Sequence, residues 1–375
     1  MKQDIDHNLT YQSKELCQPM RVLFLTGREI QYPRNDVLLR AFRRFSQVTV
    51  LSETTNGSLI GRSLQVGLQA LSHLRSGKYD LVFVGFYGHF LMLPTGLLTQ
   101  QPILFDAFLS TYDTMSFDRQ IFGPQTMRGR LAFWLDRTAC RLADHVLLDT
   151  EEQVTYFNHT FNLPLQAFSA LHVGNNEDLF YPQSGNRQDG TTSVLYYCSY
   201  LPLHGVETVI RAAASLKKEP IHFRLIGSGL EYRRIRKLAD ELALQNVTFI
   251  PPVSLTTLPD EIATADICLG GHFGNSYKAA RVIPGKIYQI LAMARPVIAT
   301  TTPANQRLLS HRETAYLCPP HDPDALAASI LALHRNPALR HHLAVQGRLL
   351  YEAQCSEAVI TAQLTKLVHC LTKST

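Results

Sequence analysis

Basic side chains flank a glycine-rich segment in the second half of the chain. Lys278 and Arg281 follow the glycines of residues 270–274, and Lys286 falls in the first turn of a helix that Pro284 is expected to start. A cation opposes the dipole at a helix N-terminus, whereas an anion is favoured there. The pattern therefore indicates a bound anion such as a diphosphate, against the alternative of two solvated side chains on an exposed loop.

Two further glycine-containing turns follow expected strands. One contains His204 and Gly205, and the other contains Gly227 and Gly229. Glycine lets a backbone approach a phosphate closely, and the N-terminus of a following helix offers free N–H groups. Each turn could equally be a plain strand-to-helix connection. The second turn lacks the third glycine of the dinucleotide fingerprint, so no nicotinamide cofactor is expected.

Carboxylates in the first half of the chain follow the short apolar run 103–105. Asp106 comes directly after this run, and Asp113 lies seven positions further on. Carboxylates at the carboxyl end of a strand can act as general bases or position hydroxyl groups. A helix cap or an Asx turn is the competing explanation for Asp113. We take Asp106 and Asp113 as candidate catalytic residues and expect Asp106 to line a cleft.

The loop after the first apolar run, residues 21–26, is the candidate acceptor side of the same cleft. We expect it to contact the acceptor or a donor phosphate through Gly27, Arg28, Tyr32 and Arg34.

These loops need a scaffold that brings strand ends together, and the spacing of the apolar runs predicts one. Short apolar runs alternate with helix-length amphipathic segments in both halves, which is typical of βαβ units and parallel sheets. The polar segment 181–192 interrupts this rhythm and predicts a linker. The predicted fold class is α/β, with two Rossmann-like, doubly wound domains facing a cleft. Ligands of such folds bind at the carboxyl ends of the strands, so the cleft is the predicted site.

The composition excludes several classes of protein. Of the 375 residues, 45% are hydrophobic and 18% are charged, which is typical of a globular chain. The formal net charge of +5 is too small to indicate nucleic-acid binding, although it is compatible with anionic substrates or lipids. Seven cysteines without a CxxC pair argue against a zinc site and favour a reducing compartment, so we expect a cytoplasmic protein.

Several segments, in the correct order, resemble retaining, nucleotide-sugar-dependent glycosyltransferases of the GT-B fold, those grouped as glycosyltransferase family 4. LHGVE stands where the family usually carries Lys-Gly, and LIGSG, NVTFIPPV and AD follow in the family's order. The segment PGKIYQILAMARPVI, residues 284–298, resembles the family's hallmark stretch ending in PVI. By this resemblance the donor-binding residues are His204, Gly205, Gly227, Gly229, Val253, Gly274, Lys278, Arg281, Lys286 and Gln289.

The chain departs from this family at two charged positions. Many family members carry two glutamates eight positions apart, one facing the sugar and one the ribose, whereas this chain has Arg281 and Gln289. Glutamine can still bond ribose hydroxyls, but without charge assistance.

The resemblance implies a hexosyltransferase-like enzyme that moves a sugar from a nucleotide diphosphate sugar to an acceptor hydroxyl with retention, in glycan or glycolipid assembly. The acceptor would be a glycan, a lipid-linked sugar or a small molecule. No cofactor and no divalent metal are expected, because no carboxylate pair lies beside the phosphate loop. Two alternatives stay open: a non-catalytic GT-B binding partner, and a sugar-nucleotide epimerase of the same fold.

The resemblance also divides the chain. We expect a polar extension at 1–19, an acceptor-binding domain at 20–180, a nucleotide-sugar-binding domain at 181–354, and a C-terminal helix at 355–375 that packs back on the first domain. Arginines surround Phe133 and Trp134, so a further hypothesis is peripheral contact with the inner face of a membrane.

Overall fold

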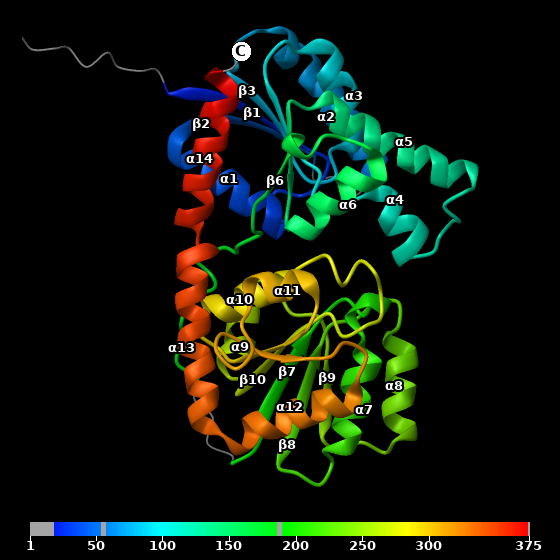
Figure 1. Cartoon of the computed structure of the whole chain (residues 1–375), viewed down its shortest axis with the longest axis vertical. Helices are drawn as coiled ribbons and strands as arrows, with labels where there is room; N and C mark the ends of the chain where they lie inside the picture. Colours follow the sequence, from blue (N-terminus) through cyan, green and yellow to red (C-terminus); the bar gives the residue numbers. More distant parts are fainter. Residues whose placement is uncertain (1–18, 54–57, 186–189, 374–375) are drawn as a thin grey trace, which may run out of the picture.

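The protein has two parallel six-stranded sheets, one in each half of the chain. The structure is a computed structural model that describes residues 19–53, 58–185 and 190–373. Part of the predicted linker, residues 186–189, and nearly all of the N-terminal extension, residues 1–18, lie outside the described residues. Figure 1 shows the two sheets in separate layered domains, each flanked by helices.

The first domain alternates strands and helices through residue 170. Its strands are β1 (Met20–Thr26), β2 (Ser46–Ser52), β3 (Leu81–Val84), β4 (Ile103–Asp106), β5 (His145–Leu148) and β6 (Phe168–Ala170). Its helices are α1 (Pro33–Phe45), α2 (Leu59–Arg75), α3 (His89–Leu98), α4 (Thr111–Asp113), the π-helix η1 (Thr114–Asp118), α5 (Met127–Leu142), α6 (Glu151–Phe161) and the 3-10 helix η2 (Leu165–Ala167).

The second domain repeats the alternation. Its strands are β7 (Thr192–Tyr197), β8 (Ile221–Ile226), β9 (Val247–Ile250), β10 (Ile267–Gly271), β11 (Val297–Thr300) and β12 (Tyr316–Cys318). Its helices are the 3-10 helix η3 (Pro202–His204), α7 (Val206–Ser215), α8 (Tyr232–Glu241), α9 (Leu258–Ala263), α10 (Gly285–Ala292), α11 (Pro303–Leu308), α12 (Pro323–Arg335), α13 (Pro337–Gln354) and α14 (Glu357–Lys373).

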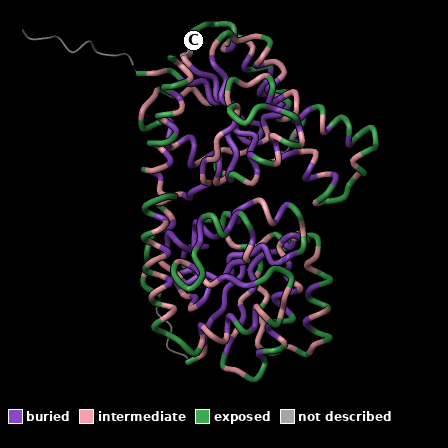
Figure 2. The backbone as a smooth tube through the Cα atoms, viewed as in Figure 1, coloured by how far each residue is buried: buried purple, intermediate pink, exposed green. Residues whose placement is uncertain are grey.

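The buried strands are uniformly apolar because helices cover both faces of each sheet. Four consecutive side chains of β1, from Val22 to Leu25, have no exposed surface. A strand that is covered on one face only would instead alternate between apolar and polar residues. Figure 2 shows the same pattern, with buried strands inside both domains and exposed residues on the outer helices. The predicted fold class is confirmed.

The strand order places the functional loops at one edge of each sheet. The first sheet runs β2-β1-β3-β4-β5-β6 and the second runs β12-β11-β10-β7-β8-β9, all in parallel. The chain therefore reverses its direction of winding between β1 and β3, and between β7 and β10. Loops that leave adjacent strands at such a reversal diverge and leave a crevice, where ligands of doubly wound folds bind.

Helices α13 and α14 run from the second domain back to the first, along one side of the molecule (Figure 1). Ile360, Leu364 and Val368 of α14 are fully buried in a hydrophobic cluster with residues of β1 and α1. The carboxylate of Glu357 pairs with Arg40 and Arg44 of α1. The end of the chain thus ties the two domains together.

A buried ion pair joins α1 to the end of β4. The guanidinium of Arg34 approaches the carboxylate of Asp106 to 2.8 Å, and neither side chain has exposed surface. Arg34 also donates to the backbone oxygens of Leu171 and His172, at 2.7 and 3.0 Å. Removing one partner would leave the other as an uncompensated charge in a medium of low polarity.

Asp106→Asn should therefore destabilise the protein by about 3–5 kcal/mol, the range for breaking a buried pair. Denaturant unfolding measures this loss. Asp80→Asn is the matched control, because Asp80 pairs with Arg21 in an exposed contact and should cost less than about 1 kcal/mol. Equal, small losses for both variants would contradict a structural role for the Arg34–Asp106 pair.

Candidate functional site

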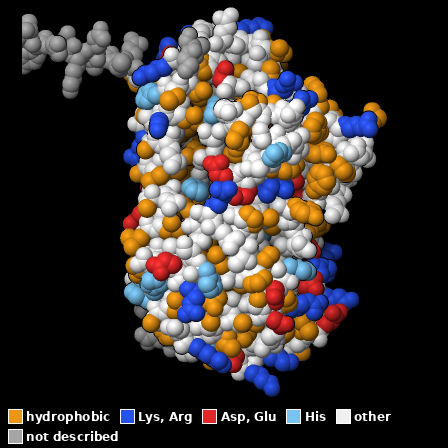
Figure 3. All heavy atoms as spheres, in the orientation of Figure 1, with side chains coloured by type: hydrophobic (Ala, Val, Ile, Leu, Met, Phe, Trp, Pro, Cys, Tyr) orange, Lys and Arg blue, Asp and Glu red, His pale blue; other side chains and the backbone are white. Residues whose placement is uncertain are grey.

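A cavity of about 330 Å³ lies between the two domains. The first domain contributes loops that follow β1, β3, β4 and β5, and the second contributes loops that follow β7 and β10. On one face of the molecule, Figure 3 shows acidic and basic side chains gathered along the waist between the domains. The cavity thus lies where the strand order predicts a ligand site.

The N-terminus of α10 forms part of the cavity wall through Pro284 and Gly285. No side chain caps this helix, and the space beside the Cα of Gly285 is open, since an added Cβ there would meet nothing within 4 Å. The amide of Ile287 already donates to the oxygen of Pro284, so the amides of Gly285 and Lys286 are the ones left for a ligand, and the helix dipole favours an anion.

Lys286 adds a positive charge behind this helix end. Its side chain is 9% exposed, and its ammonium lies 5.0 Å from the centre of the Tyr196 ring. Among the described residues, no carboxylate forms an ion pair with Lys286. Burial lowers the pKa of the ammonium to about 8, and the nearby Cys198 opposes this shift. An anionic ligand would compensate the charge that the protein leaves unpaired.

Two histidines beside Lys286 are neutral. Burial, with the charge of Lys286 as a second cause, lowers the pKa of His204 to about 2 and that of His272 well below its usual value. The Nδ1 of His204 accepts a hydrogen bond from the backbone of Leu201 at 3.1 Å. Both rings line the cavity, 5.5 Å apart, and offer hydrogen bonds rather than charge.

The predicted donor glycines let the loops of the second domain pack on each other. Gly205 has φ of 61°, and a Cβ there would lie 2.2 Å from the backbone nitrogen of Gly274. That nitrogen already donates to the oxygen of Leu203. At Gly227 and Gly229 a Cβ would collide with the backbone oxygens of Cys198 and Ser199. The structure thus accounts for these four glycines without a ligand.

Lys278 and Arg281, expected to hold a donor anion, pair with carboxylates of the first domain instead. The ammonium of Lys278 lies 3.5 Å from Asp118 and donates to Thr114 at 2.9 Å. The guanidinium of Arg281 donates to Asp113 at 2.7 Å and lies over the ring of Tyr156. In this structure both cations join the domains, and neither offers an unpaired charge to a phosphate.

Gln289 and Val253 are the remaining residues predicted on the donor side. The Oε1 of Gln289 accepts a hydrogen bond from the Tyr197 hydroxyl at 2.9 Å, three positions after Lys286 on the same helix. Val253 is partly buried against the hydrophobic core. Neither residue lines the cavity.

The first domain offers an aromatic wall with one cation. Arg28 lies over the rings of Tyr32 and Tyr87, at 4.6 and 5.3 Å from their centres, and all three residues line the cavity. Gly27 lies directly before this loop, where a Cβ would collide with the hydroxyl of Ser63.

Three first-domain residues do not lie where the sequence predicted. The expectation that Asp106 lines the cleft is wrong, because the ion pair with Arg34 encloses both side chains in the core of the first domain. Arg34 for the same reason does not lie on the acceptor side. Asp113 faces the second domain, but Arg281 engages its carboxylate.

Sequence reasoning missed several residues that line the cavity, among them Asp149, His272 and the aromatic residues Phe86, Tyr87 and Phe108. Asp149 does not cap the following helix, because the hydroxyl of Thr150 accepts from the backbone of Gln153 and caps α6. Its position directly after an apolar strand was the available signal. His272 lies in the glycine-rich segment, for which the prediction rested on the charged side chains alone.

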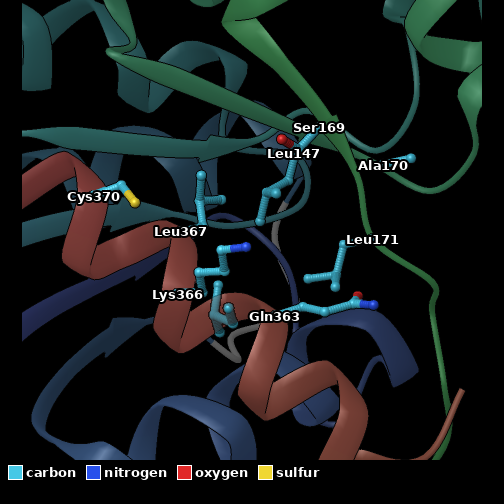
Figure 4. A pocket seen from close by; sticks show the side chains of 9 residues that line it. Leu147, Ser169, Ala170, Leu171, Gln363, Lys366, Leu367 and Cys370 are labelled. Atoms are coloured by element: carbon cyan, nitrogen blue, oxygen red, sulfur yellow. The ribbon is translucent and has the colours of Figure 1, made fainter. Parts of the chain in front are cut away.

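A separate cavity of about 330 Å³ lies in the first domain, between α14 and the ends of β5 and β6 (Figure 4). The side chains of Leu147 and Leu171 lie on its sheet side, and Leu367 comes from the helix. Apolar groups dominate this lining, and none of the predicted site residues belongs to it. We therefore place the candidate site in the interdomain cavity.

Sequence comparisons match part of the chain to glycosyltransferases. Residues 192–336, within the second domain, match the family model described as glycosyl transferases group 1. Over 145 residues the chain is 30% identical to WcaI of Escherichia coli K12, named as a colanic acid biosynthesis glycosyl transferase, and over 134 residues it is 27% identical to WbjE of Pseudomonas aeruginosa, named as a glycosyltransferase. These matches cover 38% and 34% of the chain, but only 35% and 32% of the lengths of those two proteins.

Solved structures resemble the whole chain rather than one domain. A sucrose-phosphate synthase from Thermosynechococcus elongatus superposes with a TM-score of 0.76 at 18% identity, covering 95% of this chain and 100% of that one. HepE of Anabaena, solved in complex with UDP, superposes with a TM-score of 0.72 at 14% identity over 94% of this chain and 100% of that one. The fold is the GT-B fold of known glycosyltransferases.

The described residues form neither a membrane-spanning helix nor a cluster of metal ligands. No helix among them is long and apolar enough to cross a bilayer, and no group of three or more His, Cys, Asp or Glu among them could hold a metal ion.

The pKa of Lys286 predicts how anion binding depends on pH. A pKa of about 8 means that the ammonium is charged below pH 8 and loses its proton as the pH rises further. Binding of inorganic diphosphate should therefore weaken by about tenfold or more between pH 7 and pH 9.5, since a charge-assisted hydrogen bond contributes about 1.5–3 kcal/mol. Isothermal titration calorimetry measures this dependence.

The variant Lys286→Ala supplies the control for this titration. It should bind inorganic diphosphate weakly at every pH in the range, with no step near pH 8. A step of the same size in the variant would assign the titration to another group.

Proposed function

We propose that this chain is a glycosyltransferase that moves a sugar from a nucleotide diphosphate sugar to an acceptor hydroxyl. The observation that carries the proposal is the buried, unpaired ammonium of Lys286 behind the uncapped N-terminus of α10. A diphosphate meets both features, because it brings negative charge and several acceptor oxygens. The family match of residues 192–336 supports the same chemistry.

In this proposal the second domain holds the donor. Lys286 and the first amides of α10 stabilise the negative charge that develops on the leaving diphosphate, which is the main contribution expected of the protein. Gln289, three residues further along the helix, hydrogen-bonds the adjoining ribose. The neutral rings of His204 and His272 bond uncharged oxygens of the donor. HepE of Anabaena, a protein of the same fold, was solved with UDP-glucose, so we propose a UDP-sugar as the first donor to test.

The first domain holds the acceptor in this proposal. Tyr32, Phe86, Tyr87 and Phe108 line the cavity with aromatic faces, which suit the C–H faces of a sugar ring. Arg28 adds hydrogen-bond donors above two of these rings. A saccharide acceptor in polysaccharide assembly is consistent with the colanic acid biosynthesis for which WcaI is named.

We further propose transfer with retention, in which the acceptor attacks from the face that the diphosphate leaves. The resemblance to retaining enzymes of glycosyltransferase family 4 supports this course. The anomeric configuration of the product, measured by NMR, tests it. The two other functions left open by the sequence, a non-catalytic partner and an epimerase, have no observation of their own in the structure.

We also infer contact of the first domain with an anionic membrane surface. Met127, Leu131 and Trp134 form one stripe along α5, and they are 89%, 63% and 51% exposed. The exposed Arg128 and Arg130 lie on the same helix. Figure 3 shows hydrophobic side chains gathered on this projecting part of the first domain. Exposed apolar side chains beside arginines favour an interface with anionic lipid.

The donor proposal predicts a selective defect in the variant Lys286→Ala. UDP binding should weaken by about 1.5–3 kcal/mol, the range for a charge-assisted hydrogen bond, while uridine binding should change much less because uridine has no phosphate. Calorimetry with both ligands on one preparation measures the difference. Lys237→Ala, which removes an equally charged but exposed side chain of α8, should bind both ligands normally. Equal losses for UDP and uridine in Lys286→Ala would instead show a structural role.

The membrane hypothesis predicts the behaviour of Leu131→Glu. This variant should sediment several-fold less than the wild type with vesicles containing phosphatidylglycerol at low salt, because it places a negative charge within the apolar stripe. Leu349→Glu alters a similarly exposed leucine of α13, 51% exposed, and should sediment like the wild type. If the wild type does not associate with these vesicles, the hypothesis is wrong.

A further inference from the structure

Asp149 is a buried carboxyl group in the wall of the interdomain cavity. It directly follows β5 at the carboxyl edge of the first sheet, and its residue is 2% exposed. It lines both the site cavity and a neighbouring cavity that contains Arg307 and His172. Asp149 therefore lies between the two cavities, close enough to contact a ligand bound in the interdomain cavity.

The carboxylate of Asp149 accepts a hydrogen bond from its own backbone amide and forms no ion pair with a described side chain. Its Oδ1 is buried and makes no hydrogen bond. The site cavity has one other carboxylate, Asp118, and Lys278 pairs with it. Asp106 and Asp113, the two carboxylates that the sequence favoured, are also paired with arginines. Asp149 is thus the carboxylate of the cavity that is left to meet a substrate.

No structural task explains an acidic residue at this position. Thr150 caps the following helix, and the three guanidinium nitrogens of Arg34 are already bonded to Asp106, Leu171 and His172. A buried carboxyl group without a partner lowers the stability of a fold. Such a cost is typical of groups that act on a substrate.

The surroundings also keep Asp149 near its titration point at neutral pH. Burial raises the pKa of the carboxyl group to about 7, whereas the charges of Arg34 and Lys278 lower it and that of Asp106 raises it. Tyr288 also lies near it. The other titratable or charged groups that line its two cavities are Arg28, Tyr32, Tyr87, Asp118, Arg119, Glu151, Glu152, His172, His204, His272 and Arg307. A carboxylate with such a pKa is suited to take a proton from a hydroxyl group and to release it to water.

We propose that Asp149 is a catalytic residue whose carboxylate accepts the proton of the acceptor hydroxyl during sugar transfer. The inference rests on the proposed function. In the reaction, the bond between the anomeric carbon and the diphosphate oxygen breaks, and its electron pair leaves with the nucleoside diphosphate. The hydroxyl oxygen of the acceptor forms the new bond to the anomeric carbon. Its proton passes to Asp149 and then to solvent, so charge and atoms balance.

The variant Asp149→Asn keeps the shape of the side chain and removes the base. The assay uses the full chain with UDP-glucose, UDP-N-acetylglucosamine or GDP-mannose, water as the acceptor, and release of nucleoside diphosphate as the signal. We expect release to fall by about 100-fold or more, within the range for loss of a general base. The wild-type rate should rise with pH through about 7, and the residual rate of the variant should not. UDP should bind to the variant as it does to the wild type.

The pH dependence of the melting temperature distinguishes a catalytic role of Asp149 from a structural one. A folded-state pKa of about 7, above the usual 3.8, means that the wild type loses stability as the pH rises from about 4 to 7. Asp149→Asn lacks this penalty, so its melting temperature should exceed that of the wild type above pH 7. A lower melting temperature together with loss of UDP binding would overturn the inference.

Asp144→Asn is the control for substitution beside the same strand. Asp144 lies directly before β5, at the opposite end from the cavity, and accepts from the backbone of Ile103, so its variant should release nucleoside diphosphate at the wild-type rate. If Asp149→Asn matches the wild type in rate and pH profile, the inference is wrong while the proposed function stands. If the wild type neither binds UDP nor releases nucleoside diphosphate from any of the three donors, the proposed function and the inference fail together.

Discussion

The positive charge of Lys286 is buried without a carboxylate among the described residues to compensate it, directly behind Gly285 in the wall of the interdomain cavity. Each of the other two cations that the sequence placed beside it has a carboxylate partner across the cleft. A buried charge is costly when it stands alone, and this one lies in the first turn of α10, whose N-terminus no side chain caps. Both features favour one kind of ligand, a multiply charged anion held against the second domain.

The paired cations have a different consequence, because they join the two domains. Lys278 and Arg281 belong to the second domain, whereas Asp118 and Asp113 belong to the first. Glu152 and Arg307 form a further contact across the same boundary, and α14 fastens the end of the chain to α1. The width of the cavity therefore depends on electrostatic contacts that a bound anion can compete with. Donor binding and the relative position of the domains are expected to be coupled for this reason.

The sequence predicted the fold well and the site only in part. The apolar run of residues 21–26 gave the bounds of β1 to within one residue, because a strand buried on both faces is formed mainly by apolar side chains. The three-residue edge strand β6 was not predicted, since so short a segment carries no periodic pattern. Lys286 was found because the helix dipole restricts which charge belongs at a helix N-terminus.

The sequence does not show which charged side chains form ion pairs with one another. Asp106, Arg34 and Arg281 carry the right chemistry for a site, but their partners lie 72 to 168 positions away and are brought to them only by the fold. The same limit hid Asp149, whose importance comes from the absence of a partner for its Oδ1 in the folded protein. A local motif shows which groups are present, whereas burial and contact decide which of them remain free to react.

A crystal structure of the protein with UDP tests the central claim most directly. The account predicts that the diphosphate oxygens lie within hydrogen-bond distance of the Lys286 ammonium and the first amides of α10, while Asp106 and Arg34 stay paired in the core of the first domain. A diphosphate bound instead by Lys278 and Arg281, with the Lys286 ammonium out of reach of every phosphate oxygen, would contradict it.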